Sequence, residues 1–384
     1  MSPLLSISFR PFFILAASIA AINPVLWVFN YLGQLSLPLP VVDPLFWHAH
    51  EMIFGFTGAL IAGFILTASA NWTNSEPYQG KALLILILSW IIERCSYFLP
   101  LNEKYLFVLM NLFFPILWFM LLRKLWRFPK QKYVFLPILL GITIGKLFHS
   151  YGSLYSIDSF EFSGREVAVG LIRFIVLLIA GRVIPFFTIK KIKGVKIDLP
   201  RWINPISLLA ILTLAFPWPE STSKFVLVSI LSVAIIANIS RQIMWKPLST
   251  LKIPILFILH IGIAFINLEL ILKVIGIFDD QVHYTQAALH MLLAGGVGVV
   301  GIGIMTRVSL GHTGRVIMTD LWTKIAFISI ISGSILRVLV PIYYSDYFVQ
   351  SLYIASCMWT IGFLIFLFRY FGILISPRPD GKIY

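Results

Sequence analysis

Long apolar stretches alternate along the chain with short segments that carry most of its charges. Runs of predominantly apolar residues, each close to the length that crosses a bilayer, recur from one end to the other. The pattern predicts an all-α fold, a polytopic integral membrane helical bundle with about twelve transmembrane helices. The predicted spans are residues 12–32, 52–71, 82–98, 105–122, 134–153, 166–188, 203–216, 225–239, 253–277, 284–307, 321–343 and 348–375.

Composition agrees with this interpretation. Hydrophobic residues make up 59% of the chain and charged residues only 12%, whereas soluble domains contain about 25% charged residues. Too few polar side chains are present to coat a water-facing surface of this size. We therefore expect a single transmembrane domain over residues 1–384.

The basic residues cluster in alternate loops. With both termini in the cytoplasm, the inner loops hold the lysines and arginines of 123–132, 190–201 and 241–252, and the outer loops hold mainly acids. This alternation is the positive-inside pattern of membrane proteins. Topology therefore explains the net charge of +14: membrane lipid is the expected surrounding, and nucleic acid is not an expected partner.

Several ionisable residues are predicted to lie together in the outer leaflet. His48 and His50 stand at the outer mouth of the second span, His149 near the outer end of the fifth, and His290 about two turns into the tenth. Glu269 lies at similar depth in the ninth span. Such groups are costly in a membrane, and neutral imidazole is the commonest metal ligand. We interpret the four histidines as a metal or haem site, although each alone is also typical of a hydrogen-bonded core histidine.

The second and tenth spans share a pattern of glycines after a histidine. The two sets are Gly55, Gly58 and Gly63 after His50, and Gly295, Gly298 and Gly303 after His290. Small residues on one helical face allow close approach of another helix or of a flat ring such as a porphyrin. The pattern favours one haem between two axial imidazoles, His290 on one side and His50 or His48 on the other. Ordinary helix packing is the alternative.

A second set of candidates lies on the predicted cytoplasmic side. It consists of His260, Arg182 and the segment 305–315, which contains Arg307, His312 and Arg315. Guanidinium groups bind carboxylates through two parallel hydrogen bonds, so this segment can cradle an anion or a haem propionate. It is equally typical of a positive-inside loop. The arginines are expected to support a cofactor or the fold, since they offer no lone pair to a metal.

Other charges within the spans allow two interpretations. Lys146 is a further candidate partner for a propionate, as is Arg94. Glu93 beside Arg94, and Glu269 one turn before Lys273, can instead form internal ion pairs.

Four stretches carry a resemblance to a known family. They read SFRPFF at 8–13, WHAHEMIFGF at 47–56, GRVIPFF at 181–187 and TRVSLGHTGR at 306–315. With these stretches the chain resembles the NnrS family, haem- and copper-containing bacterial membrane proteins associated with the response to nitric oxide. The resemblance implies one or two haem b groups, leaves copper or another second metal open, and implies the bacterial cytoplasmic (inner) membrane. Arg10, in the first stretch, is counted among the expected cofactor-binding residues.

The leading functional hypothesis is a redox enzyme that binds nitric oxide at haem iron and reduces it. Glu269 and Glu51 would then be catalytic and supply protons, and a quinol or a periplasmic cytochrome would supply electrons. The alternatives are a non-catalytic carrier or assembly protein for haem or copper, and a protector of metal pools against nitrosative stress. A haem-based sensor ranks last, because no output domain outside the membrane is evident.

Overall fold

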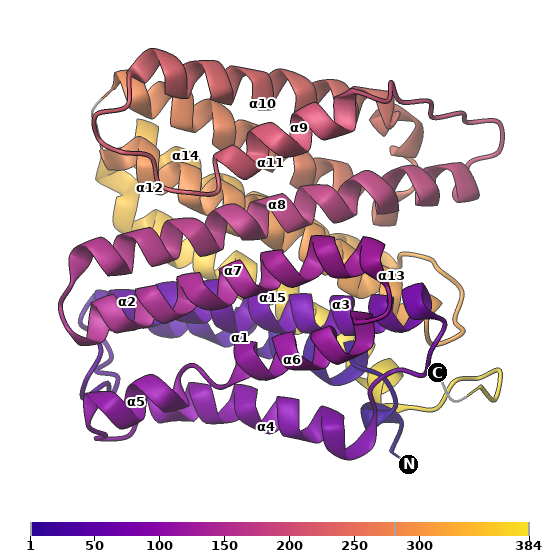
Figure 1. Cartoon of the computed structure of the whole chain (residues 1–384), viewed down its shortest axis with the longest axis horizontal. Coiled ribbons are helices and arrows are strands. Elements are labelled where there is room, and N and C mark those ends of the chain that lie inside the picture. Colours follow the sequence, from indigo (N-terminus) through magenta and orange to yellow (C-terminus); the bar gives the residue numbers. More distant parts are fainter. Residues whose placement is uncertain (1, 280–281, 383–384) are drawn as a thin grey trace. The chain divides into compact units, whose positions relative to one another are not determined.

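The computed structural model describes residues 2–279 and 282–382, and every regular element within them is helical (Figure 1). The all-α prediction is therefore confirmed for the described residues. The helices are α1 (Phe9–Tyr31), α2 (Pro44–His50), α3 (Thr57–Thr73), α4 (Gly80–Ser96), α5 (Glu103–Leu109), α6 (Phe113–Leu125), α7 (Pro129–Leu154), α8 (Asp158–Lys191), α9 (Ile203–Thr213), α10 (Lys224–Met244), α11 (Pro254–Phe278), α12 (Val282–His290), α13 (Val299–Gly311), α14 (Leu321–Tyr343) and α15 (Phe348–Ile375).

Ten helical stretches among the described residues are long and apolar enough to cross a membrane. They correspond to ten of the predicted spans, so the chain is a multi-pass membrane protein. The other two predicted spans, 82–98 and 203–216, fall on the shorter helices α4, with 17 residues, and α9, with 11. The total of twelve spans and the cytoplasmic position of both termini stay predictions.

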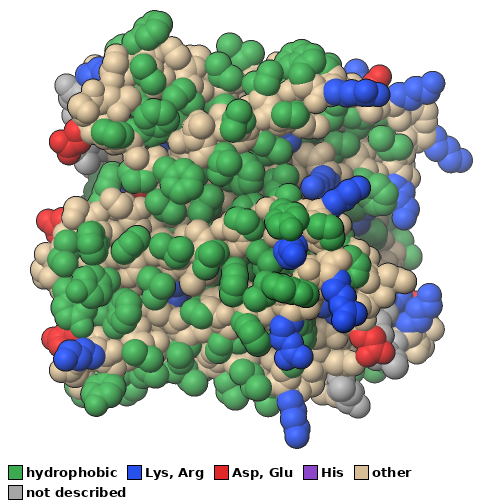
Figure 2. Space-filling view, in the orientation of Figure 1, with side chains coloured by type: hydrophobic (Ala, Val, Ile, Leu, Met, Phe, Trp, Pro, Cys, Tyr) green, Lys and Arg blue, Asp and Glu red, His purple; other side chains and the backbone are tan. Residues whose placement is uncertain are grey.

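The surface of the molecule suits contact with lipid. Hydrophobic side chains are spread over the whole face shown in Figure 2, and large apolar side chains such as Phe368, 79% exposed, and Ile236, 67% exposed, point outwards. Soluble monomers rarely expose large contiguous apolar patches. Basic residues lie instead at helix ends, as with Lys190 and Lys191 in the last turn of α8.

The chain divides into two compact units. Unit 1 contains the described residues of Met1–Val169, Met305–Ile317 and Phe363–Tyr384, and unit 2 those of Gly170–Ile304 and Met318–Gly362. Helices α8, α13 and α15 each contribute residues to both units. The expectation of one domain over the whole chain stays a prediction.

The glycines of the shared pattern receive neighbouring side chains. In unit 1, a Cβ atom added to Gly63 would lie 2.9 Å from the ring of Phe13. In unit 2, a Cβ atom added to Gly298 would lie 2.1 Å from the indole of Trp359. At these positions the structure favours the helix-packing interpretation, since aromatic side chains occupy the space that glycine leaves.

Both histidine-bearing helices change their winding directly after the histidine. A π-helix follows α2 at Glu51–Phe56, immediately after His50, and another follows α12 at Met291–Gly298, immediately after His290. Single π-helical turns within α-helices are frequent at functional sites. The likeness between the two spans therefore extends from the glycine positions to the backbone.

Candidate functional site

Two of the predicted histidine ligands lie together inside unit 1. His50, the last residue of α2, and His149, on α7, are both fully buried. Their rings are nearly parallel, with an angle of 9° between the planes and 6.2 Å between the centroids. The ring of Phe46 packs against both imidazoles, 5.5 Å from that of His50 and 4.8 Å from that of His149. One aromatic side chain therefore contacts both imidazoles.

The hydrogen bond of His149 fixes which of its nitrogens is protonated. Its Nδ1 lies 3.1 Å from the backbone carbonyl of Glu161. Because a carbonyl oxygen only accepts, Nδ1 carries the proton and Nε2 carries the lone pair. The Nε2 atom is buried and has no hydrogen-bond partner among the described residues. This imidazole is therefore held in the tautomer that a metal ligand needs.

The remaining outer histidines are held in a similar way. In unit 2, Nδ1 of His290 lies 2.9 Å from the backbone carbonyl of Gln286, which again assigns the lone pair to Nε2. In unit 1, Nδ1 of His48 lies 2.9 Å from Oδ1 of Asn23, and the His48 ring stacks on Trp27. The prediction that His290 shares one haem with His50 or His48 stays a prediction.

His50 has two polar neighbours, one of which sequence reasoning missed. The hydroxyl of Tyr97, a fully buried residue directly after α4, lies 2.7 Å from Nδ1 and 3.3 Å from Nε2 of His50. The carboxylate of Glu51 lies 3.6 Å from the same nitrogen. A proton on Nδ1 would be donated to the Tyr97 oxygen and stabilised by the Glu51 charge. No motif marks Tyr97, because its partner lies 47 residues away in the chain.

The site of four histidines that the sequence predicts stays a prediction. Within the described ranges 2–279 and 282–382, no group of three or more histidine, cysteine, aspartate or glutamate side chains is placed to hold a metal ion. Within unit 1, the outer site instead offers the pair His50 and His149.

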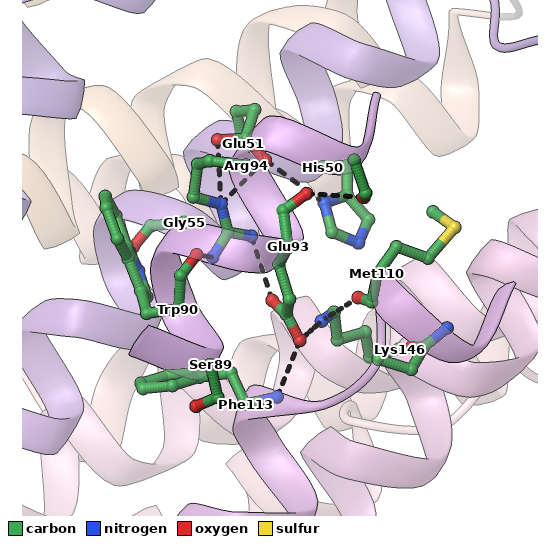
Figure 3. A network of polar contacts seen from close by, with 12 residues as sticks. His50, Glu51, Gly55, Ser89, Trp90, Glu93, Arg94, Met110, Phe113 and Lys146 are labelled. Atoms are coloured by element: carbon green, nitrogen blue, oxygen red, sulfur yellow. Dashed lines mark hydrogen bonds and ion pairs between the residues drawn. The ribbon is translucent and has the colours of Figure 1, made fainter. Parts of the chain in front are cut away.

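A buried network of four charged side chains lies beside His50 (Figure 3). The Nε atom of Arg94 donates to both carboxylate oxygens of Glu51, at 3.0 and 3.1 Å. A terminal nitrogen of Arg94 lies 3.1 Å from the carboxylate of Glu93, whose other oxygen accepts from Lys146 at 2.7 Å. The backbone N–H of Phe113 also donates to Glu93. The two negative and two positive charges of this network sum to zero. The ion pair between Glu93 and Arg94, one of the two interpretations of these charges, is confirmed.

Glu269, the other predicted proton donor, belongs to a separate network in unit 2. Its carboxylate lies 2.8 Å from Arg173 and 3.5 Å from Lys273, one helical turn away. Arg173 also donates to the backbone carbonyl of Leu214. The pairing of Glu269 with Lys273 is confirmed, and these contacts connect α8, α11 and the end of α9.

Arg10 was expected at a cofactor, and the structure shows it at a helix end. The side chain is buried, and its Nη1 donates to the backbone carbonyls of Leu374 and Ser376, at 2.8 and 2.7 Å. Carbonyls in the last turn of a helix have no partner within the helix. Arg10 therefore caps the C-terminal end of α15.

The segment 305–315 is mostly helical, because α13 continues to Gly311. The following turn places the His312 ring 5.8 Å from Phe9, and Arg378 donates to the His312 backbone carbonyl. Burial of His312, with the positive charges of Arg378 and Arg307, lowers its pKa below the usual value. Arg315 donates to the backbone carbonyl of Thr313. The residues expected to form a cradle thus lie at a helix end and in the turn after it, next to Arg378 of the C-terminal segment, and binding of an anion or a propionate there stays a prediction.

The last two candidates lie in unit 2 in different environments. Arg182 is exposed on α8. His260, on α11, is buried, and neither of its ring nitrogens has a hydrogen-bond partner among the described residues. His260 therefore has a ring nitrogen that is free to bind a metal.

A comparison with protein families covers nearly the whole chain. The family model described as "NnrS protein" matches residues 3–378. The chain belongs to the NnrS family. No curated protein matches it. The fold and the family together make it a multi-pass membrane protein of the nitric oxide response.

Three of the stretches that resemble the NnrS family have visible structural roles. Residues 47–56 form the end of α2 and the π-helix that follows it, and so carry both His50 and Glu51. Residues 8–13 form the start of α1 and contain the Arg10 cap. Gly181, which begins the stretch 181–187, packs against the guanidinium of Arg241.

Proposed function

We propose that this NnrS family member binds haem b through its outer histidines and reduces nitric oxide there. The observation that carries the proposal is the pair His50 and His149, with a buried, unpartnered Nε2 on His149. A polar nitrogen that is buried without a partner is costly unless a ligand uses it.

The two imidazoles of His50 and His149 suit haem better than a metal ion that is held by protein ligands alone. Haem iron takes one or two protein ligands, whereas a structural zinc site takes four and a catalytic one three. Two imidazoles that bind one ion at metal–nitrogen distances of about 2 Å have ring centres at most about 6 Å apart. The separation of His50 and His149 is 6.2 Å, at this limit. His48 and His290 remain proposed ligands for a second haem, copper or another metal.

The reaction that we propose is balanced by electrons and protons from outside the chain. Two molecules of nitric oxide, two electrons and two protons give one nitrous oxide and one water. Haem held by only one of the two imidazoles would leave a position open for nitric oxide and supply a one-electron centre, and a quinol or a periplasmic cytochrome would supply the electrons. The protein must therefore position the haem, exclude water and deliver protons.

The charge network gives the proton-handling residues of the proposal. Glu51 directly follows His50, and Arg94 neutralises its carboxylate, so an ionised acid is tolerated at this depth and can take up and release a proton. The Tyr97 hydroxyl lies within hydrogen-bond distance of both ring nitrogens of His50, and Glu51 lies near Nδ1, so these two residues would fix the orientation of the ring. Glu269 stays a second proposed proton donor, held by Arg173 and Lys273.

The test is haem and metal analysis of the purified protein, with optical spectra before and after addition of nitric oxide. We expect bound haem whose spectrum shifts with nitric oxide, and nitrous oxide formation when a reduced quinol is added. His149→Ala should lose a haem signal, whereas His283→Ala, at an exposed histidine of the same predicted side, should not. Haem without nitrous oxide formation would favour the carrier or protector, and a haem-free protein would refute the proposal.

A further inference from the structure

Unit 2 contains a buried cation whose contacts are all neutral. Arg241, on α10, is 1% exposed. Its Nη1 donates to the hydroxyl of Ser207 at 2.6 Å and to Oδ1 of Asn238 at 3.1 Å, and its Nη2 donates to the backbone carbonyl of Leu177 at 3.3 Å. No carboxylate of the described residues forms an ion pair with it. Arg94, in contrast, has two carboxylate partners.

Two hydrogen-bond donors at this place are unused. Nε of Arg241 and Nε1 of Trp245, one helical turn later, are both buried without a hydrogen-bond partner among the described residues. The guanidinium lies over the Trp245 ring, 5.1 Å from its centroid. Both groups can only donate, so what is missing is an acceptor.

The neighbouring helix leaves room for the guanidinium. A Cβ atom added to Gly181, on α8, would lie 2.3 Å from Nη2 of Arg241. Any other residue at this position would therefore displace the cation. Gly181 opens one of the four stretches that resemble the NnrS family, and no step of the proposed nitric oxide chemistry uses it.

We infer that Arg241 and Trp245 form an anion site that holds one monovalent oxyanion between α8, α9 and α10. Guanidinium stays charged in proteins, and a buried charge is stable only when it is paired. One negative charge balances Arg241, and its oxygen atoms accept from Nε and Nε1. The oxyanion is either free and small, such as nitrite, or the phosphodiester of a lipid headgroup. The site does not depend on haem binding.

The experiment uses the purified full-length protein in detergent and a small oxyanion as probe. The melting temperature is followed as sodium nitrite replaces sodium gluconate at constant ionic strength, and bound phospholipid is measured as phosphorus per chain. Nitrite should raise the melting temperature to a plateau if the site takes a free anion. One tightly bound phosphorus per chain is expected if it takes a lipid.

The variants separate the site from a general salt effect. Trp245→Phe keeps the ring and removes one donor, so it should weaken the nitrite response about tenfold, the loss of one hydrogen bond to a charged group, or release the bound phospholipid. Arg241→Gln should abolish the response. Arg201→Gln, at an exposed cation of the same unit, should behave as the unchanged protein.

Two results would overturn the inference. The first is a protein with neither a nitrite plateau nor bound phospholipid. The second is a Trp245→Phe variant that binds either one as the unchanged protein does. If Arg241→Gln does not fold, the Trp245→Phe variant alone decides.

Discussion

The charges of the four side chains beside His50 sum to zero, and this predicts that losing two opposite charges together costs less than the sum of the two single losses. Nζ of Lys146 lies 2.7 Å from Glu93, and both side chains are at most 1% exposed. Lys146→Met leaves Glu51 and Glu93 facing only Arg94, a net charge of minus one. Breaking a buried pair in this way costs about 3–5 kcal/mol of unfolding free energy. Glu93→Gln should cost a similar amount, because it leaves a net charge of plus one.

The double variant Glu93→Gln with Lys146→Met restores neutrality. We expect it to be more stable than the sum of the two single losses predicts, by about 2–3 kcal/mol. The assay is denaturant unfolding of the purified variants in mild detergent, with all four members of the cycle measured together. Equal and additive losses would show that the two side chains do not interact, which would refute the network.

Two further predictions concern packing and topology. Gly298→Ala should lower the free energy of unfolding by about 1–3 kcal/mol, because the added Cβ atom would lie 2.1 Å from Trp359. Gly372→Ala is the control: nothing lies within 4 Å of its added Cβ atom, so the same denaturant assay should show no loss. Cysteines introduced at Lys130 and at Asp279 should react with membrane-impermeant reagents from the inside and from the outside, respectively. A swap between them would invalidate the inferred depth of the histidines.

The helices could be predicted because a span is a local property of the chain. An apolar run of sufficient length specifies a membrane helix by itself. The residues 203–216 show where this reasoning weakens, since α9 has only 11 residues. The two π-helices were not predicted, because no residue pattern used in sequence reasoning distinguishes them from α-helix.

The candidate site could be predicted only in part, because its contacts join distant residues. The sequence identified His50 and His149 as ligands at one depth, and the structure brings them together in unit 1. It did not identify Tyr97, or the pairing of Arg94 with Glu51 across 43 residues. Sequence reasoning expected Arg10 at a cofactor and did not identify its hydrogen bond to the end of a helix 364 residues away. The type of a residue therefore predicts which interactions its side chain can make, but the fold determines which residue it contacts.

Because a π-helix follows His50, the orientation of this histidine depends on the number of residues between Glu51 and Phe56. A π-helical turn holds one residue more than an α-helical turn, which corresponds to about 100° of rotation around the helix axis. Within this turn, the backbone carbonyl of Gly55 accepts a hydrogen bond from the indole N–H of Trp90, at 3.1 Å. Deleting one residue between Glu51 and Phe56 would let this turn rewind as α-helix. The imidazole of His50 would then swing away from His149, although no ligand had been mutated.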